Sequence, residues 1–183
     1  MTNDLMPQSI RGCARFFAGI FALAAVAAAF SIPVRAQDAP PQLQPPAGQE
    51  LFLRLQGKGD QVYVCKADAT PPAWTLKAPD AQLLKDGAPF GKHFAGPSWQ
   101  AADGSKVVGK AAANVPSPDA DSIPWLLVNV VSHEGKGIFE RANYIQRLNT
   151  KGGKAPSAGC DAAHAGQEIR VAYSADYLFY AAK

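Results

Sequence analysis

Hydrophobic and polar residues alternate with a period of two over most of the chain after residue 49. The pattern is clear in LFLRLQG at 51–57, where three leucines alternate with other residues. Six further stretches continue it: QVYVCK at 61–66, AWTLKA at 73–78, KVVGKAA at 106–112, GIFERANYIQRLNT at 137–150, EIRVAY at 168–173 and YLFYA at 177–181. Alternation of this kind is typical of β-strands with one buried face and one solvated face.

A continuous apolar run, IPWLLVNVV at 123–131, interrupts the alternation and predicts a strand buried on both faces. Glycine-containing turns separate the candidate strands: Asp-Gly at 86–87 and 103–104, Gly-Lys-Gly at 135–137 and Gly-Gly at 152–153. These residues supply the positive φ angles that tight hairpins need. No stretch after residue 49 has the pattern of a long amphipathic helix, so antiparallel connections are expected. The pattern predicts an all-β fold, an antiparallel β-sandwich or flattened barrel of about 8–10 strands.

The amino terminus has the pattern of a secretory signal peptide over residues 1–36. Arg11 and Arg15 lie before the apolar run FFAGIFALAAVAAAF, and the sequence VRA places the cleavage site between Ala36 and Gln37. A membrane anchor is the alternative interpretation. The apolar run is shorter than the roughly 18–20 residues that a spanning helix needs, so we expect cleavage and no transmembrane anchor afterwards.

The processed chain then begins with QDAPPQLQPPAG at 37–48, a proline-rich sequence that predicts an extended spacer. Residues 49–183 are expected to form a single β domain. Without the three arginines and one aspartate of residues 1–36, the chain keeps 15 basic and 14 acidic residues. This near balance argues against a nucleic-acid partner.

Two cysteines, Cys65 and Cys160, remain after cleavage. An even number of cysteines in an exported chain predicts a disulfide, because compartments outside the cytoplasm are oxidising. Two buried free thiols are the alternative. The expected location is extracytoplasmic, either periplasmic or secreted.

The stretch GKHFAGPSWQAADGS at 91–105 concentrates the residue types that carry chemistry. A triad of His93, Asp103 and a serine, or an acid–base pair of His93 and Asp103, would make the protein a hydrolase. Neither Ser98 nor Ser105 lies in a Gly-x-Ser-x-Gly sequence, which is one setting of a nucleophilic serine. His93 and Asp103 are therefore weak catalytic candidates.

The same stretch also suits a structural role. Asp103 and Gly104 predict a hairpin turn with a positive φ at the glycine, and Trp99 could then pack across the hairpin near Val107. His93, in the preceding strand, could bond to backbone groups. A third interpretation is a binding surface that uses His93 and Trp99.

Metal and cofactor sites have little support in the sequence. The histidines have no short paired spacing and predict no metal site; they are His93, His133 and His164. No cofactor is expected. Around the glycine pair at 152–153, Arg147, Lys151 and Lys154 could bind an anion or could form a solvated hairpin tip.

Several segments, in a fixed order, resemble the family DUF 3455 of exported proteins of unknown function from bacteria and fungi. They are QVYVCKA, WTLKAPDAQL, GKHFAGPSWQAADGSKVVG, IPWLLVNVVS, YIQRLNTKGGKAP with Cys160 after it, and VAYSADYLFY. The resemblance runs from about Leu51 to Tyr180 and implies a single extracytoplasmic domain, but no activity. Some fungal relatives are labelled malate dehydrogenase, but this chain has no glycine-rich strand-to-helix turn followed by an acidic residue.

The sequence favours a non-enzymatic exported module that binds a small molecule, a glycan or an envelope partner. The alternatives are a hydrolase that uses His93 and Asp103, and a structural component of the envelope.

Overall fold

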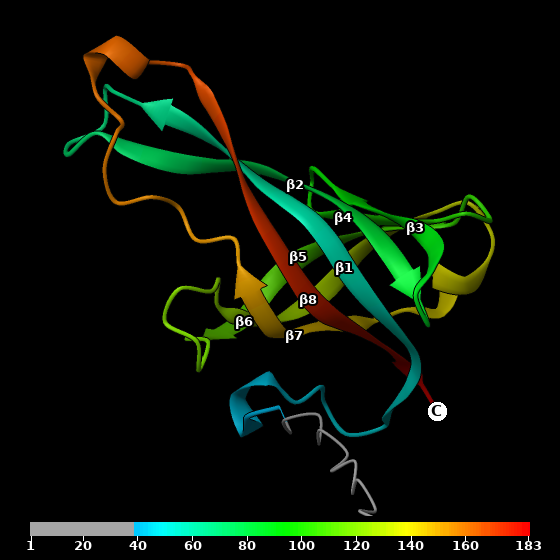
Figure 1. Ribbon diagram of the computed structural model, residues 1–183. Helices are drawn as coiled ribbons and strands as arrows, with labels where there is room; N and C mark the ends of the chain where they lie inside the picture. The colour runs from blue at the N-terminus through cyan, green and yellow to red at the C-terminus, as the bar shows by residue number, and fades with distance from the viewer. Residues whose placement is uncertain (1–38) are drawn as a thin grey trace, which may run out of the picture. The chain divides into compact units, whose positions relative to one another are not determined.

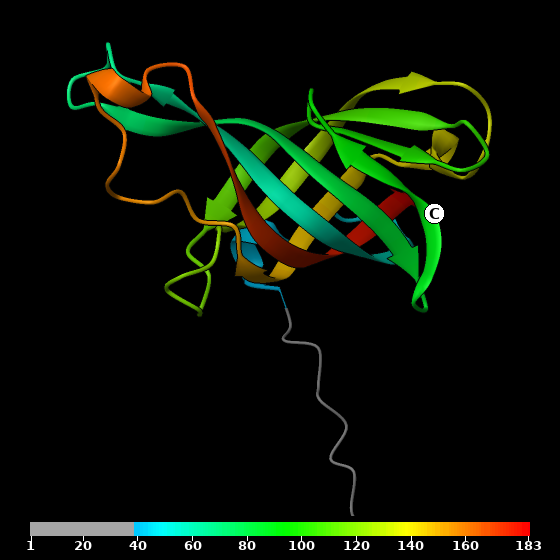
Figure 2. The same ribbon diagram turned by 45° about the horizontal axis from the view of Figure 1, so that its top comes forward.

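The computed structural model describes residues 39–183, which form a closed barrel of eight antiparallel strands (Figures 1 and 2). The strands are β1 (Gln49–Lys66), β2 (Ala73–Lys85), β3 (Ala88–Phe94), β4 (Ser98–Ala101), β5 (Lys106–Val115), β6 (Trp125–Glu134), β7 (Tyr144–Gly152) and β8 (Glu168–Ala182). Each strand pairs with the next, and β8 pairs with β1 to close the sheet. The all-β prediction is confirmed, with the flattened barrel rather than the sandwich.

The interior of the barrel is a cluster of buried apolar and aromatic side chains. Inward positions alternate with outward ones along each strand, as the period of two predicts. Large buried members of the cluster come from four different strands: Leu83, Trp99, Ile145, Tyr177 and Phe179. An eight-stranded barrel is just wide enough for such side chains to fill it or to leave room for one small ligand.

Several strand predictions differ from the structure. The stretches at 168–173 and 177–181 are the single strand β8, and the apolar run of β6 is buried on both faces only in its first half, since Val131 is 58% exposed. The stretches at 51–57 and 61–66 are one continuous strand, β1. At Gly59, in the middle of β1, the neighbouring strand β2 comes so close that a Cβ on residue 59 would lie 2.5 Å from the Cα of Ala81. The stretch at 137–150 begins instead with a 3-10 helix, η2 (Ile138–Arg141), and β7 starts only at Tyr144. Side-chain oxygens of Asp103 and Ser105 accept the first backbone N–H groups of η2, so this backbone needs no strand partner.

Strands β1, β2 and β8 extend past the rest of the barrel as a three-stranded ribbon (Figure 1). At the end of this ribbon, Cys65 of β1 is bonded to Cys160 of the connection between β7 and β8, with an S–S distance of 2.05 Å. The predicted disulfide is therefore present. A third 3-10 helix, η3 (Ala162–His164), follows Cys160. The disulfide ties this long connection to the ribbon.

A second apolar cluster lies on the outer face of the barrel. Leu43, in the 3-10 helix η1 (Pro41–Leu43), packs there against Trp125, Leu127, Leu148 and Leu178 and is fully buried. The carbonyl oxygen of Leu43 also accepts a 2.7 Å hydrogen bond from the side chain of Gln146. Part of the proline-rich segment at 37–48 is thus packed on the domain.

The predicted signal peptide and its cleavage site at Ala36 and Gln37 lie outside the described residues. Within residues 39–183, no helix has the length and apolar character needed to cross a membrane.

Candidate functional site

Three aromatic rings meet inside the barrel. His93 of β3 and Trp99 of β4 stack with their ring centroids 4.3 Å apart and their planes 11° apart. The ring of Tyr177, on β8, stands edge-on to both, with centroids 5.2 Å from His93 and 5.7 Å from Trp99. His93 is 3% exposed, Trp99 is 2% exposed, and Tyr177 is fully buried. The candidate residues His93 and Trp99 therefore form one interior wall with a residue that is distant in sequence.

Glycines make room for two of these rings. A Cβ on Gly109 of β5 would lie 2.9 Å from the indole ring of Trp99 and would also collide with Val128. A Cβ on Gly57 of β1 would collide with the ring of Tyr177. The sequence thus places glycine where a strand passes directly beneath an aromatic ring.

His93 is held in one protonation state and one tautomer. Burial lowers its pKa from 6.5 to about 3, so the ring is neutral near pH 7. Its Nδ1 lies 2.9 Å from the carbonyl oxygen of Ser98. A carbonyl only accepts, so Nδ1 carries the proton and Nε2 is a hydrogen-bond acceptor. The predicted backbone bond of His93 is confirmed.

A cavity of about 180 Å³ lies against the aromatic wall. The lining residues are mostly apolar or aromatic and come from all eight strands and the turn between β3 and β4: Gln61, Leu76, Pro79, His93, Pro97, Trp99, Ala111, Leu126, Val128, Arg147 and Tyr177. Apolar walls with a few polar groups are the usual composition of small-molecule sites. The cavity is therefore the candidate functional site.

Two residues of the cavity lining carry a buried hydrogen-bond donor that has no partner in the protein. The donors are the side-chain Nε2 of Gln61 and the indole Nε1 of Trp99, both on residues that are 2% exposed. A buried donor without an acceptor costs about 1–3 kcal/mol. Trp125 also has an unpaired buried Nε1, but it packs in the outer cluster and does not line the cavity.

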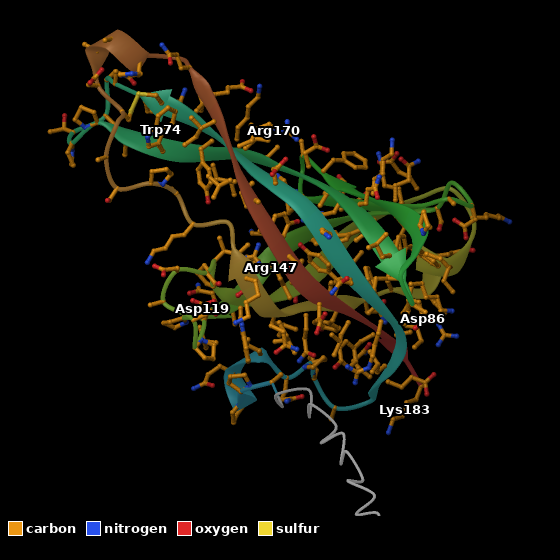
Figure 3. All side chains as sticks on the ribbon, viewed as in Figure 1. Trp74, Asp86, Asp119, Arg147, Arg170 and Lys183 are labelled. Atoms are coloured by element: carbon orange, nitrogen blue, oxygen red, sulfur yellow. A yellow bond between two sulfur atoms is a disulfide. The ribbon has the colours of Figure 1, made fainter. Side chains whose placement is uncertain are left out.

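Arg147, on β7, is the charged residue of the cavity wall (labelled in Figure 3). It pairs in register with Tyr177, which fixes its side chain on the inner face of the barrel. Its Nε and Nη2 donate to the carbonyl oxygen of Pro124 over 3.2 and 2.8 Å. These bonds lie at the surface and hold the guanidinium at the edge of the cavity.

Asp103 has different neighbours from His93. In the turn between β4 and β5, its carboxylate accepts hydrogen bonds from the backbone and hydroxyl of Ser105 and from the backbone of Ile138. These bonds, first that of the Ser105 hydroxyl, lower the pKa of Asp103. Gly104 has φ +89°, as predicted for this turn. Asp103 does not line the cavity, and the group bonded to His93 is a carbonyl rather than a carboxylate.

The other residues considered for a metal or anion site form hydrogen bonds within the protein. Nε2 of His133 lies 2.8 Å from the carbonyl oxygen of Ala142, and His164 bonds to Asp161. In the part of the chain that the structure describes, no three His, Cys, Asp or Glu residues form a group that could hold a metal ion. Near the glycine pair, Lys151 bonds to Asp119 and Lys154 to a backbone carbonyl, so with Arg147 they fasten the loop before β6.

Sequence reasoning missed Gln61 and Tyr177 as residues of the site, and considered Arg147 only for an anion site or a solvated hairpin tip near the glycine pair. For Arg147 a signal existed, because it shares a strand face with the apolar Ile145. For Gln61, the signal was a polar residue at an inward position of an otherwise apolar strand face. Neither signal identifies a cavity until the barrel is closed.

The comparisons with known proteins agree with the resemblance in the sequence. The family described as "Protein of unknown function (DUF3455)" matches the chain over residues 46–181. No curated protein and no solved structure matches it.

Proposed function

We propose that this chain, which belongs to the DUF3455 family, is an exported module that binds one small molecule inside its barrel. The observation that carries the proposal is that the two residues with unpaired buried donors, Gln61 and Trp99, line the same cavity, which opens to solvent beside the half-exposed Leu76. A ligand with an acceptor group would satisfy both donors.

The coincidence of the two donors with a cavity matters more than either donor alone. Trp125 has the same unpaired indole N–H and does not line this cavity, so one orphaned donor is a cost that the fold tolerates. Two unsatisfied donors on residues of one cavity are explained if selection favours the protein with its ligand bound. Residues that serve binding often reduce the stability of the free protein.

The cavity also limits the size of the ligand. Its volume of about 180 Å³ is close to that of an engineered apolar cavity of about 150 Å³ that accepts benzene. The ligand that fits is a single ring or a molecule of similar size, rather than a glycan chain. The aromatic wall of His93 and Trp99 supplies a flat surface for such a ring.

Export is supported by the disulfide between Cys65 and Cys160, because disulfides persist in oxidising compartments. With the signal-peptide pattern of residues 1–36, it favours a periplasmic or secreted protein. The intact mass of the exported protein tests this. A mass that begins at Gln37 supports export and cleavage, and a product that retains residues 16–30 contradicts them.

A thermal-shift screen of the processed protein with neutral and charged one-ring compounds tests the binding proposal. A ligand that binds the native state raises the melting temperature by mass action. We expect Trp99→Phe, which removes the N–H but keeps a ring, to reduce the shift. The matched control is Trp125→Phe, which removes an equally orphaned N–H from the outer cluster and should leave the shift unchanged. Equal loss in both variants, or no shift with any compound, would contradict the proposal.

A further inference from the structure

We infer that the interior site takes a small carboxylate on a one-ring body, with the carboxylate bound by Arg147; this inference rests on the proposed function. The residues that line the cavity include one cation, Arg147, and the two residues with orphaned buried donors, Gln61 and Trp99. All three groups donate hydrogen bonds, and a carboxylate is a group that only accepts them.

Arg147 has no acidic partner among residues 39–183. Its hydrogen bonds go to the neutral carbonyl of Pro124. Among the other arginines of residues 39–183, Arg141 pairs with Glu50 and Arg170 with Asp60 and Asp80, while Arg54 is exposed on the outer face and forms no ion pair. The guanidinium of Arg147 is partly open to solvent and has no counter-ion, so it can pair with a carboxylate that enters the cavity.

The titratable groups that face Arg147 do not supply a negative charge near pH 7. They are Tyr63, His93, Tyr173 and Tyr177, and each is influenced by the charge of Arg147. Burial raises the pKa of all three tyrosines and lowers that of His93, so all four are neutral. The cavity therefore carries a positive potential that neutral side chains do not cancel.

The aromatic wall of the cavity favours a ligand that contains a planar ring. His93 and Trp99 present a stacked aromatic pair, and Tyr177 stands edge-on to it. A planar ring can lie against these side chains while its carboxylate reaches the donors. Nε2 of His93 is a hydrogen-bond acceptor, so it would repel a carboxylate placed next to it. A hydroxyl group on the ligand ring could instead donate to this nitrogen.

Isothermal titration calorimetry with benzoate and benzamide tests the inference, because the two probes have the same ring and similar size but differ in charge. At pH 7 and low salt, we expect benzoate to bind at least about tenfold more tightly than benzamide. Added NaCl should reduce this difference through screening. Arg147→Gln should abolish the preference for benzoate and keep benzamide binding.

The matched control is Arg170→Gln, which removes an arginine from the ion pairs of the outer ribbon and should keep the preference (Figure 3). If Arg147→Gln does not fold, Arg147→Lys retains the charge and should bind benzoate more tightly than benzamide, with the same decline in salt. Equal affinity of the wild-type protein for benzoate and benzamide would contradict the inference that the ligand is a carboxylate, without contradicting the proposal that a ligand binds inside the barrel. Binding of neither probe, with no other one-ring compound active in the thermal screen, would overturn the proposed function itself.

Discussion

His93 and Trp99 face each other across the hairpin of β3 and β4 as register partners, and their rings are nearly parallel. The hydrogen bond from His93 to the carbonyl of Ser98 fixes the imidazole ring, and close packing over Gly109 fixes the indole ring of Trp99. The pair therefore forms a rigid, neutral wall. A rigid wall loses little conformational entropy when a ligand binds.

The buried His93 should make stability depend on pH. Because burial lowers its pKa from 6.5 to about 3, the unfolded chain binds a proton between these pH values that the folded protein does not bind. Stability contributed by neutral His93 is fully present above pH 6.5 and is lost as the pH falls toward 3. The slope is at most about 1.4 kcal/mol per pH unit.

Urea unfolding between pH 7 and pH 4.5 measures this slope, and His93→Gln is the control because it removes the titrating group. The difference in free energy of unfolding between the two proteins should change steadily over this range. Parallel pH profiles would show that His93 titrates normally and is not buried as described.

Gln61→Met should stabilise the free protein. The substitution keeps the length of the side chain and removes a buried donor that has no partner, so we expect a gain of about 1 kcal/mol in the free energy of unfolding. The same variant should bind cavity ligands more weakly. Urea unfolding and calorimetry on one preparation measure both effects. A loss of stability in this variant would mean that the amide is already bonded in the free protein.

Gly109→Ala should reduce both stability and binding. The new Cβ would press on Trp99 and Val128, and such overpacking costs about 1–3 kcal/mol. Gly104→Ala is the comparison, because φ +89° strains the turn while open space surrounds the Cβ. It should lower stability but leave ligand affinity unchanged. Equal affinity in both variants would contradict the position of Trp99 in the site.

The disulfide should contribute substantially to stability, because its two cysteines are 95 residues apart. Closing a loop of this length in the unfolded chain is worth at most about 4–5 kcal/mol in the entropy model. The double substitution Cys65→Ser and Cys160→Ser should therefore lower the free energy of unfolding by a large part of this amount. Non-reducing peptide mapping of the wild-type protein checks the bond itself, and two alkylatable thiols would disprove it.

Local features could be predicted from the sequence because they depend on neighbouring residues. The turn at Asp103 and Gly104, the packing of Trp99 opposite Val107 and the backbone bond of His93 all follow from one short stretch. The choice between barrel and sandwich could not be predicted, because it depends on whether β8 reaches β1. The site depends on the same closure, since it brings Gln61, Arg147 and Tyr177 from distant strands to one cavity.

Titration of the indole N–H resonances by nuclear magnetic resonance tests interior binding most directly. Residues 39–183 contain three tryptophans in distinct environments: Trp74 bonds to the carbonyl of Ala158, Trp99 is unpaired in the cavity, and Trp125 is unpaired in the outer cluster. With a ligand from the screen, we predict that the resonance of Trp99 moves to the frequency of a hydrogen-bonded indole while those of Trp74 and Trp125 stay in place. A ligand that moves Trp74 or Trp125 and leaves Trp99 unchanged would contradict a binding site inside the barrel.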